Sequence, residues 1–589
     1  MIEPFDAAQD QLFEVTDEQD RRLALSATGL LRSFNEAGVL TAADVHVAQR
    51  VGAMAGEDDD HVLLALAMAT RAVRHGSVCL DLATVADVAA DLPWPAYDGW
   101  VDVVTASPLV ELGVLRWEFD LLYLDRYWHQ EVQVCADLMT RLEQSPPVVD
   151  ATVLDAGVAR VFSGETYAEQ RVACRDAATR WTTVLTGGPG TGKTTTVAGL
   201  LALLAEQASL LGQTLRIGLT APTGKAAARL QEAVVSAAGA LPQVDQDRLG
   251  TLQASTLHRL LGWRRDNSTR FRHHRANRLP HDVVVVDETS MVSLTMMTRL
   301  VEAVRPDARL ILVGDPDQLA SVDAGAVLSD LVSGFAATPE SPVVGLSTTH
   351  RFGEEIGRLA AALRGGSADE VLAVLRAGSD EVEFVESGDP APLLRHSILA
   401  AALAVRSAAD AGDRSGAVAA LDRHRLLCAH REGPYGVRHW NRQVEHWITE
   451  AVGDPLYEEM YVGRPLLVTA NDYGLGVYNG DAGVVVRDGD SRRAVIAGPS
   501  GLLSFATSRL SDVETMHAMT IHKSQGSQAD HVTVLLPPEE SRLLTRELFY
   551  TAVTRAKKKV RVVGSEASVR AAVERRAQRA SGLRQRLGG

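Results

Sequence analysis

The segment that most constrains the fold is a glycine-rich stretch that reads Gly187-Gly188-Pro189-Gly190-Thr191-Gly192-Lys193-Thr194. An apolar run precedes it and an Ala/Leu-rich stretch follows it, so we expect a strand, a tight loop and a helix. In such a loop, backbone N–H groups converge on phosphate oxygens at the start of the helix. The pattern predicts a nucleoside triphosphate site in which Lys193 reaches the β and γ oxygens and Thr194 ligates magnesium.

Length and composition indicate a globular protein of several domains. The 589 residues are 46% hydrophobic and 23% charged, and a chain of this size divides into about three or four domains. Apolar runs are interrupted well before roughly 18 residues, so we expect no membrane span. Cys79, Cys135, Cys174 and Cys428 show no zinc or redox spacing. They predict reduced, mostly buried thiols in a cytoplasmic protein.

The net charge of -16 is concentrated at one end of the chain. Residues 1–150 hold 26 acidic side chains against 9 arginines and no lysine, a net charge of -17, which leaves +1 for the rest. An acidic segment repels a phosphate backbone and suits a protein partner, although it can also be a solvated surface that aids solubility. Four of the eight tryptophans lie between Trp94 and Trp128, in a buried core or a docking face.

The spacing of apolar residues divides the chain into regions. Residues 1–115 are predicted to be mainly helical. From residue 181, short β-rich runs alternate with helical stretches, which is typical of an α/β parallel sheet with ligands at the carboxyl ends of its strands. A second α/β region follows residue 341. Inside it, short strand-like segments with Gly and Asp turns over residues 463–508 predict a small β-barrel insertion.

Two further motifs in the first α/β region carry chemistry. Four valines at residues 283–286 predict a buried strand that ends at Asp287 and Glu288. Asp287 can hold magnesium through water while Glu288 polarises the attacking water, although such a pair can also cap a following helix. The segment at residues 314–319 ends another predicted strand and places Gln318 where it can sense the γ-phosphate. A simple Pro/Asp turn is the alternative.

Two arginines of the second region are candidates for contacts with the transition-state charge. They are Arg351 in Thr-His-Arg-Phe and Arg555 in Thr-Ala-Val-Thr-Arg-Ala. In an arginine-rich chain either can also be a surface residue. If both act, the nucleotide lies between two lobes, and hydrolysis can move one lobe against the other.

In this order, the motifs resemble those of superfamily-one helicases, in the branch that moves 5′ to 3′ along single-stranded DNA. Within that branch the chain resembles the RecD family, the motor subunits of RecBCD complexes (exonuclease V). Ser77 stands where this family often has His. The motor segments that match are Gln170 and residues 187–194, 221–227, 255–262, 287–291, 314–319, 351, 520–527 and 550–557. Residues 427–433, 463–465 and 471–481 resemble the RecD family specifically. The N-terminal segments 76–80 and 122–128 also resemble that family, but more weakly.

The resemblance implies an α/β fold with two RecA-like parallel-sheet motor domains, a mainly helical N-terminal domain and a small SH3-like β-barrel insertion. We expect an acidic partner-docking domain over residues 1–115 and a first motor domain over 116–340, with a hairpin insertion near 263–280. The second motor domain is expected over 341–589, with the barrel near 458–510.

The resemblance also assigns roles to residues. Gln170 reads the adenine, and Thr194 and Asp287 hold the metal. The catalytic residues are Lys193, Asp287, Glu288, Gln318, Arg351 and Arg555. The nucleotide-binding residues are Gln170, Gly187, Gly188, Pro189, Gly190, Thr191, Gly192, Lys193, Thr194 and Thr195. The DNA-binding residues are Thr223, Lys225, Thr256, His258, Asn471, Asn479, Thr520 and His522.

A basic and aromatic stretch before residue 280 is a further candidate for DNA contact. Translocation needs contacts that grip phosphates and stack on bases without reading sequence. We hypothesise an accessory hairpin that turns at residues 266–268 and separates strands, with a solvated loop as the alternative. Its basic and aromatic residues are Arg259, Trp263, Arg264, Arg265, Arg270, Phe271, Arg272, His273, His274, Arg275 and Arg278.

The expected function is that of an ATP- and Mg2+-dependent 5′-to-3′ DNA helicase in double-strand break repair by homologous recombination. The expected partners are single-stranded DNA, duplex ends, and RecB-like and RecC-like subunits in a heterotrimer. The sequence has no compact metal–carboxylate nuclease site, so nuclease activity is expected from a partner subunit. The alternatives are a free-standing 5′-to-3′ helicase, a regulatory subunit that uses ATP as a conformational signal, and an RNA-directed motor.

Overall fold

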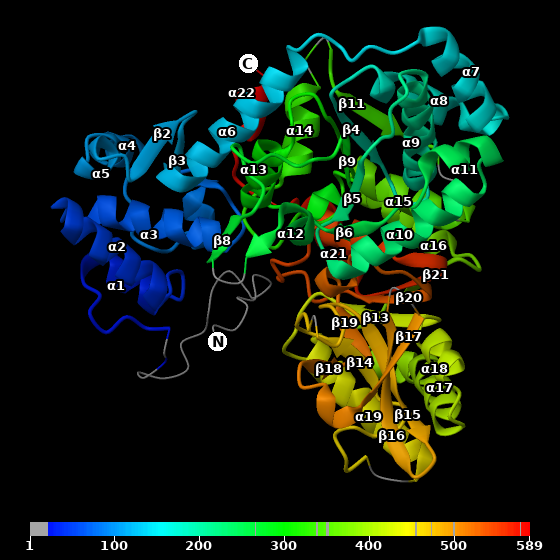
Figure 1. Cartoon of the computed structure of the whole chain (residues 1–589). Coiled ribbons are helices and arrows are strands. Elements are labelled where there is room, and N and C mark those ends of the chain that lie inside the picture. The colour runs from blue at the N-terminus through cyan, green and yellow to red at the C-terminus, as the bar shows by residue number, and fades with distance from the viewer. Residues whose placement is uncertain are drawn as a thin grey trace.

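The computed structural model describes residues 20–588 apart from 21, 265–266, 337, 339, 349–352, 454–455, 473, 499–500 and 578. The candidate finger Arg351 lies outside the described residues. The chain forms an N-terminal region and two lobes, and the second lobe carries an inserted sheet (Figure 1).

The N-terminal region is mainly helical, as predicted, but it also contains a small antiparallel sheet with strand order β1-β3-β2. Leu115 and Leu122 lie in its hydrophobic core, so the packed region continues past the predicted border at residue 115. Phe34 packs edge-on against Trp94, and Trp94 lies beside Trp100, so these aromatic residues belong to the core. The elements are α1 (Gly29–Glu36), α2 (Ala42–Ala55), α3 (Asp60–Arg74), β1 (Cys79–Leu80), α4 (Tyr97–Thr105), α5 (Pro108–Glu111), β2 (Leu115–Glu118) and β3 (Leu121–Leu124).

Helix α6 (Asp125–Leu142) joins this region to the first lobe. Its buried Arg141 donates to Thr182 Oγ1 and to the carbonyl of Trp181, both at 2.9 Å. A guanidinium with several fixed donors can bond several acceptors at once, so Arg141 locks the helix to the start of the first central strand.

The first lobe is a six-stranded sheet in the order β11-β4-β10-β9-β5-β6, with every pair parallel. The four valines of β9 are fully buried, as expected for a central strand that helices cover on both faces. The strands are β4 (Thr182–Gly187), β5 (Ile217–Ala221), β6 (Ala254–Thr256), β9 (Val283–Val286), β10 (Arg309–Gly314) and β11 (Val343–Leu346). The helices are α7 (Ala151–Val161), α8 (Ala168–Ala178), α9 (Lys193–Leu210), α10 (Gly224–Gly239), α11 (Gln243–Leu249), α12 (Leu257–Leu261), α13 (Leu294–Ala303) and α14 (Val327–Phe335).

The second lobe is a five-stranded parallel sheet in the order β12-β21-β20-β13-β19. Its strands are β12 (Val382–Val385), β13 (His424–Cys428), β19 (Ala518–Thr520), β20 (Ala529–Leu535) and β21 (Ala556–Val563). Its helices are α15 (Glu354–Gly365), α16 (Ala368–Ala377), α17 (Ala391–Asp410), α18 (Arg414–Leu421), α19 (Val437–Val452), α20 (Arg546–Val553) and α21 (Glu566–Glu574). The two predicted parallel-sheet domains are therefore confirmed.

The predicted insertion is a five-stranded antiparallel sheet in the order β17-β16-β15-β14-β18. Val485, Ala494 and Ile496 lie in its own small core, while the neighbouring Val484 and Val495 point into the core of the second lobe. This alternation is the period of two that a strand imposes, and it fixes the insertion to the lobe. The strands are β14 (Pro465–Val468), β15 (Ala482–Asp488), β16 (Ser491–Gly498), β17 (Gly501–Ala506) and β18 (Val513–Thr515).

Two smaller elements complete the chain. Strands β7 (Trp263–Arg264) and β8 (Asn267–Phe271) pair as an antiparallel hairpin on the first lobe. Beyond α21 the chain returns to the N-terminal region, where the Val78 N–H donates to the Ala580 carbonyl at 2.8 Å. The last helix, α22 (Leu583–Gly588), then buries Leu583 and Leu587 in the core of the first lobe. No local sequence pattern predicts this return of the chain to the N-terminal region.

Candidate nucleotide site and nucleic-acid interface

The strand order of the first sheet sorts the candidate residues into two groups. The phosphate loop follows β4, Gln318 lies in the turn after β10, and Asp287 follows β9; these three strands are neighbours. Thr186 is level with Gly314 in the sheet, so the first two segments begin side by side. The candidate DNA residues instead follow β5 and the edge strand β6. The candidate nucleotide residues therefore lie at the centre of the sheet, and the candidate DNA residues of this lobe lie toward one edge.

The phosphate loop is tightly folded around Lys193. The Lys193 ammonium donates to the Gly187 and Gly188 carbonyls at 2.6 and 3.0 Å, and Thr191 Oγ1 donates to the Gly188 carbonyl at 2.9 Å. Gly190 and Gly192 both have φ of +85°, a conformation that side chains with a Cβ rarely adopt. The helix then begins at Lys193, with Thr194 in its first turn and Thr195 exposed.

Gln170 lies where a base contact is expected. It is buried on α8, and its Nε2 donates to the Thr191 carbonyl of the loop at 3.2 Å. Within the described residues its buried Oε1 has no hydrogen-bond partner. A buried acceptor without a donor is costly, so this atom is suited to the donor group of an adenine. The site therefore fits a nucleotide that carries such a donor.

Asp287 and Glu288 stand at the end of β9. Burial and the neighbouring Glu288 raise the pKa of Asp287, while the positive charge of Lys193 opposes the rise. Glu288 has φ of +50°, in the left-handed region, which is a rare and strained conformation for a residue with a Cβ. Strain of this kind persists only where the surrounding packing holds the backbone in place. The backbone conformation of Glu288 therefore helps to determine where its carboxylate points. A divalent cation at this position would offset the cost of the buried carboxylate.

Gln318 and Arg555 meet across the two lobes. The buried Arg555 donates from Nη2 to Gln318 Oε1 at 2.8 Å, and Gln318 Nε2 donates to Asp315 Oδ2 at 2.9 Å. Burial lowers the pKa of Arg555, and the charge of Glu288 opposes that shift. Two residues that the sequence singled out separately are thus joined by one hydrogen bond.

Sequence reasoning missed the second hydrogen bond that Asp315 accepts. The Tyr550 hydroxyl donates to Asp315 Oδ2 at 3.0 Å, and both side chains are buried. Nearby, the Leu319 N–H donates to Thr551 Oγ1 and Gln525 Nε2 donates to the Leu319 carbonyl, both at 2.9 Å. The turn after β10 is therefore held by side chains of the second lobe. Their place inside the matched motifs was the only signal that the sequence offered.

The candidate DNA residues of the first lobe lie at two helix starts. Thr223 Oγ1 accepts from the Ala226 N–H at 3.2 Å and caps α10, and Thr256 Oγ1 accepts from the Arg259 N–H at 3.3 Å and caps α12. His258 is exposed beside Phe271 of the hairpin, with ring centroids 5.8 Å apart. N-terminal N–H groups and exposed rings can contact phosphates and bases respectively.

Lys225 brings the insertion to the first lobe. Its ammonium donates to the Gly480 carbonyl at 3.2 Å, and burial lowers the pKa of Lys225 to about 8. Next to Gly480, the Asn479 N–H donates to Asn471 Oδ1 at 2.9 Å, and both asparagines are exposed. The structure therefore brings Lys225, Asn471 and Asn479 to one surface although about 250 residues separate them.

The other candidate DNA residues lie in the second lobe beside a groove. Thr520 ends β19, and its Oγ1 accepts from the Lys523 N–H at 3.2 Å, with His522 between them. A groove of about 550 Å³ opens between α19, β18 and the loop after β13. Its charged lining is mixed, with Arg431, Arg438, Arg442 and Arg464 beside Glu432, Glu445 and Glu514. The Lys523 ammonium pairs with Glu514 of that lining at 2.8 Å. Lys523 thus links the motif to the groove, where Arg431 also pairs with Glu514 and Arg438 pairs with Glu432.

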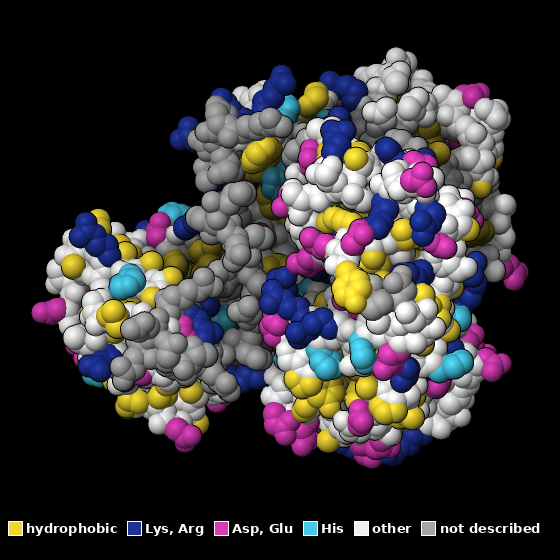
Figure 2. All heavy atoms as spheres, turned by 90° about the horizontal axis from the view of Figure 1, so that it is seen from below, with side chains coloured by type: hydrophobic (Ala, Val, Ile, Leu, Met, Phe, Trp, Pro, Cys, Tyr) yellow, Lys and Arg dark blue, Asp and Glu magenta, His cyan; other side chains and the backbone are white. Residues whose placement is uncertain are grey.

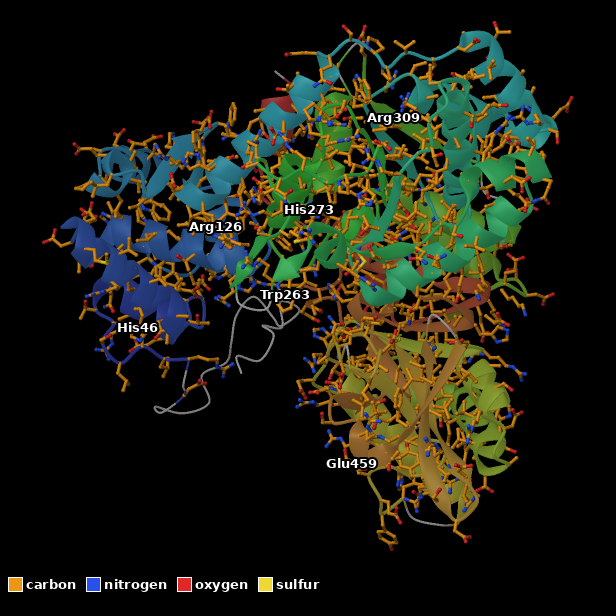
Figure 3. The ribbon with its side chains drawn as sticks, in the orientation of Figure 1. His46, Arg126, Trp263, His273, Arg309 and Glu459 are labelled. Atoms are coloured by element: carbon orange, nitrogen blue, oxygen red, sulfur yellow. The ribbon has the colours of Figure 1, made fainter. Side chains whose placement is uncertain are left out.

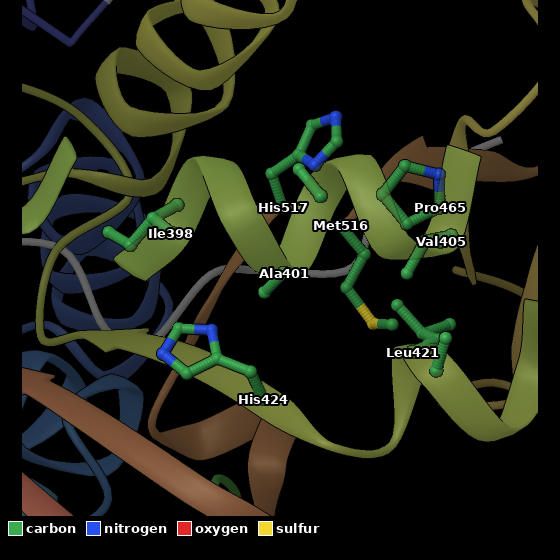
Figure 4. Close-up of a pocket in the computed structure, with 10 residues that line it drawn as sticks. Ile398, Ala401, Val405, Leu421, His424, Pro465, Met516 and His517 are labelled. Atoms are coloured by element: carbon green, nitrogen blue, oxygen red, sulfur yellow. The ribbon is translucent and has the colours of Figure 1, made fainter. Parts of the chain in front are cut away.

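A second cavity has no such chemistry. It holds about 30 Å³ between α17, β13 and β14 and is lined mostly by apolar side chains with His424 and His517 (Figure 4). Burial lowers the pKa of His424 to about 4 and that of His517 to about 3, so both are neutral at pH 7. None of the candidate site residues lines it.

The hairpin of the first lobe carries part of the predicted basic stretch. Trp263 is 39% exposed and lies on the side of the lobe nearer the N-terminal region (Figure 3). Arg275 is already paired with Asp137 of α6 at 2.7 Å, which makes it less available to DNA than predicted. Arg265 and Asp266 lie outside the described residues. From the side of the insertion, basic and acidic side chains are intermingled rather than gathered (Figure 2).

In the described part of the chain, no helix is long and apolar enough to cross a bilayer. Likewise, three or more His, Cys, Asp or Glu side chains are nowhere grouped as a metal site among those residues. The four cysteines are free thiols, three of them buried.

Three protein-family models match successive parts of the chain. They are the N-terminal domain of RecBCD enzyme subunit RecD over residues 36–150, an AAA domain over 170–324, and the UvrD-like helicase C-terminal domain over 515–563. The second match contains the phosphate loop and the third contains Arg555.

Curated relatives match almost the whole chain. RecBCD enzyme subunit RecD of Mycobacterium tuberculosis (strain H37Rv) is 61% identical over 96% of this chain and 98% of the relative. The same subunit of Mycolicibacterium smegmatis is 62% identical over 95% of this chain and 99% of the relative. ATP-dependent RecD2 DNA helicase of Deinococcus radiodurans is 30% identical over 93% of this chain and 68% of that protein. The chain therefore belongs to the RecD family and is an ATP-dependent DNA helicase.

Proposed function

We propose that this helicase uses ATP and Mg2+ to move 5′ to 3′ along single-stranded DNA and to unwind duplex ends during recombinational repair of double-strand breaks. The observation that carries the proposal is the 2.8 Å hydrogen bond between Arg555 and Gln318. It joins the turn beside the phosphate loop to a buried side chain of the other lobe. Any rearrangement of Gln318 toward a phosphate therefore has to be transmitted to the second lobe.

The nucleotide half of the proposal is supported by the first lobe. The loop supplies N–H donors and Lys193, and the unpartnered Gln170 Oε1 supplies an acceptor for the base. Thr194 and Asp287 would hold magnesium, which would neutralise charge on the phosphate oxygens. Glu288 is placed to orient and deprotonate the attacking water, and Arg555 to stabilise charge on the transferred phosphoryl group. We propose the same charge-stabilising role for Arg351.

The DNA half is supported by where the edge residues lie. Thr223, Thr256 and His258 lie at helix starts of the first lobe. Thr520 and His522 stand beside the groove of the second lobe, whose lining holds both arginines and glutamates. Asn471 and Asn479 are exposed on the insertion. Contacts spread over two lobes allow each lobe to grip the strand in turn as ATP closes and opens the cleft. We assign 5′-to-3′ polarity from the family resemblance.

The part of the proposal that concerns partner subunits rests on the N-terminal region. It matches the family model of a RecD N-terminal domain, and it carries a net charge of -17 over residues 1–150. We propose that it docks on a RecC-like subunit in a heterotrimer with a RecB-like subunit, in the cytoplasm. Nuclease activity would then come from the partner. The 30% identity to ATP-dependent RecD2 DNA helicase favours a second candidate, a helicase that works without partners.

Unwinding assays with the full chain test these proposals. Duplexes with a 5′ tail, a 3′ tail or blunt ends are compared, alone and with RecB-like and RecC-like subunits, and Lys193→Ala serves as the inactive control. We expect ATP-dependent unwinding of 5′-tailed duplex and a heterotrimeric mass. Unwinding of 3′-tailed duplex alone would contradict the polarity. Full activity of a monomer that binds neither partner would favour the free-standing helicase.

A further inference from the structure

Arg364 approaches the phosphate loop from the second lobe, and none of the motifs includes it. It stands in the last turn of α15, and a Cβ built on Gly188 would lie 3.9 Å from Arg364 Nη1 and 3.1 Å from the Tyr550 hydroxyl. The Gly188 carbonyl accepts from Lys193 at 3.0 Å. The guanidinium therefore faces the stretch of loop at which the lysine marks the position of the terminal phosphates.

The Arg364 guanidinium is close enough to Asp317 for its charge to lower the pKa of that carboxyl. Arg364 is half-buried, and in the described part of the chain it makes no hydrogen bond and no ion pair. On the same helix Arg358 is exposed and pairs with Glu355 at 2.8 Å. A guanidinium held away from water without an acceptor is unfavourable unless an anion completes the site. Asp317 acts on this charge from a distance, but among the described residues no acceptor is bonded to the Arg364 donors.

Helix α15 holds Arg364 rigidly in the second lobe. Ile356, Leu359 and Leu363 are buried in the core of that lobe, and Gly366 ends the helix with φ of +75°. Such a left-handed residue directly after a helix fixes where the helix stops and how its last turn is presented. Arg364 must therefore move with the second lobe whenever that lobe moves against the phosphate loop.

We propose that Arg364 binds the terminal phosphate of ATP from the second lobe, in addition to Arg351 and Arg555. The proposal rests on the proposed function, in which the loop binds ATP. A guanidinium presents a planar set of donors that matches phosphate oxygens, and it stays charged at any physiological pH. Because ADP lacks the phosphate nearest the second lobe, Arg364 favours ATP over ADP. Through this contact the second lobe detects which nucleotide is bound.

The test measures nucleotide discrimination in the full chain. Wild type, Arg364→Ala, Arg364→Lys and the control Arg358→Ala are compared for binding of a non-hydrolysable ATP analogue and of ADP, both with Mg2+ and single-stranded DNA. For Arg364→Ala we expect affinity for the analogue to fall about 10- to 30-fold and affinity for ADP to fall less than about 3-fold. DNA-stimulated kcat should fall about 10- to 100-fold. Arg358→Ala should match wild type.

The outcomes separate this proposal from the proposed function. If wild type shows no DNA-stimulated hydrolysis that Lys193→Ala abolishes, the proposed function fails. If wild type hydrolyses ATP but Arg364→Ala keeps the wild-type ratio of analogue to ADP affinity, the Arg364 contact alone is wrong. Equal loss of both nucleotides would mark a structural role and overturn it too. Should Arg364→Ala not fold, Arg364→Lys, which keeps charge but not the planar fork, must still lower the ratio about 3-fold or more.

Discussion

The two lobes use the same kind of parallel sheet but present opposite ends of it to the nucleotide. In the first lobe the phosphate loop, Asp287 and Gln318 all follow strands, at the carboxyl ends of β4, β9 and β10. In the second lobe Arg555 directly precedes β21, so the guanidinium comes from the amino end of a strand. The first lobe thus offers backbone donors, carboxylates and the Lys193 ammonium to the proposed site, and the second lobe offers guanidinium groups. Neither half is a complete catalytic site, which makes hydrolysis dependent on how the lobes meet.

The largest effect should come from removing the first lobe's charge on the phosphates. Lys193→Ala should lower kcat/KM for ATP by about 10,000-fold or more, because both binding and charge stabilisation depend on the ammonium. Nucleotide affinity should fall with it. DNA-stimulated phosphate release and nucleotide titration measure the two effects. Turnover within tenfold of wild type would show that the loop is not the site of hydrolysis.

Replacing the guanidinium of the second lobe should separate ATP hydrolysis from nucleotide binding. Arg555→Lys keeps a cation but loses the planar donors that reach Gln318, and we expect kcat to fall about 100-fold with nucleotide affinity changed less than about 5-fold. The control is Lys558→Arg, since Lys558 is exposed on β21 and pairs with Asp530 at 2.7 Å. If Arg555→Lys weakened binding as much as turnover, the two lobes would not divide these tasks.

The sequence predicted what is encoded locally. The glycines of the phosphate loop and the four valines before Asp287 each dictate their own structure, so the loop, the strand and the order of the motifs could be inferred. The β2–β3 hairpin could not, because its turn residues Phe119 and Asp120 have φ of +55° and +58° without the Gly or Asn that usually signals such a turn. The ring of Phe119 instead packs against the Arg586 guanidinium at 5.1 Å.

Contacts between distant segments were also beyond the sequence. Gln318 and Arg555 are 237 residues apart, and Ser77 and Ala580, which are hydrogen-bonded, are 503 apart. No local pattern states that these residues meet, since tertiary packing decides it. The family resemblance placed Gln318 and Arg555 near one phosphate, but it predicted neither their direct bond nor the approach of Arg364 to the phosphate loop. The roles of the candidate catalytic, DNA-binding and metal-binding residues are still predictions.

A smaller effect should follow from loosening the contact between the lobes without touching the charges. Tyr550→Phe removes only the hydroxyl that donates to Asp315 at 3.0 Å. We expect kcat to fall about 3- to 10-fold, because Gln318 loses part of the support for its own hydrogen bond to Asp315. Tyr550 is a positioning residue, so KM for ATP should stay within about 2-fold. A large rise in KM with normal kcat would instead place the hydroxyl in direct contact with the nucleotide.

The smallest effect concerns the segment that leads from one lobe to the other. Glu169 of α8 accepts from the Ser347 and Thr348 N–H groups at 2.8 and 3.1 Å, just after β11. Partial burial alone raises the pKa of Glu169, but the hydrogen bonds from Ser347 and Thr348 outweigh it and lower the pKa to about 2.

Because the folded pKa of Glu169 lies below its unfolded value, its stabilising contribution is present above about pH 4.5 and is lost as pH falls toward 2. Glu169→Gln should lower the free energy of unfolding by about 1 kcal/mol at pH 7, since solvent screens so accessible a group. The deficit should shrink in urea titrations at pH 4 and vanish near pH 2. The matched control is Arg175→Gln, also on α8, which removes an exposed ion pair with Asp155 of α7. A deficit that did not depend on pH would mean that the Glu169 side chain stabilises the protein through its shape. The charge of Glu169 would then not be what holds the segment at Ser347 and Thr348.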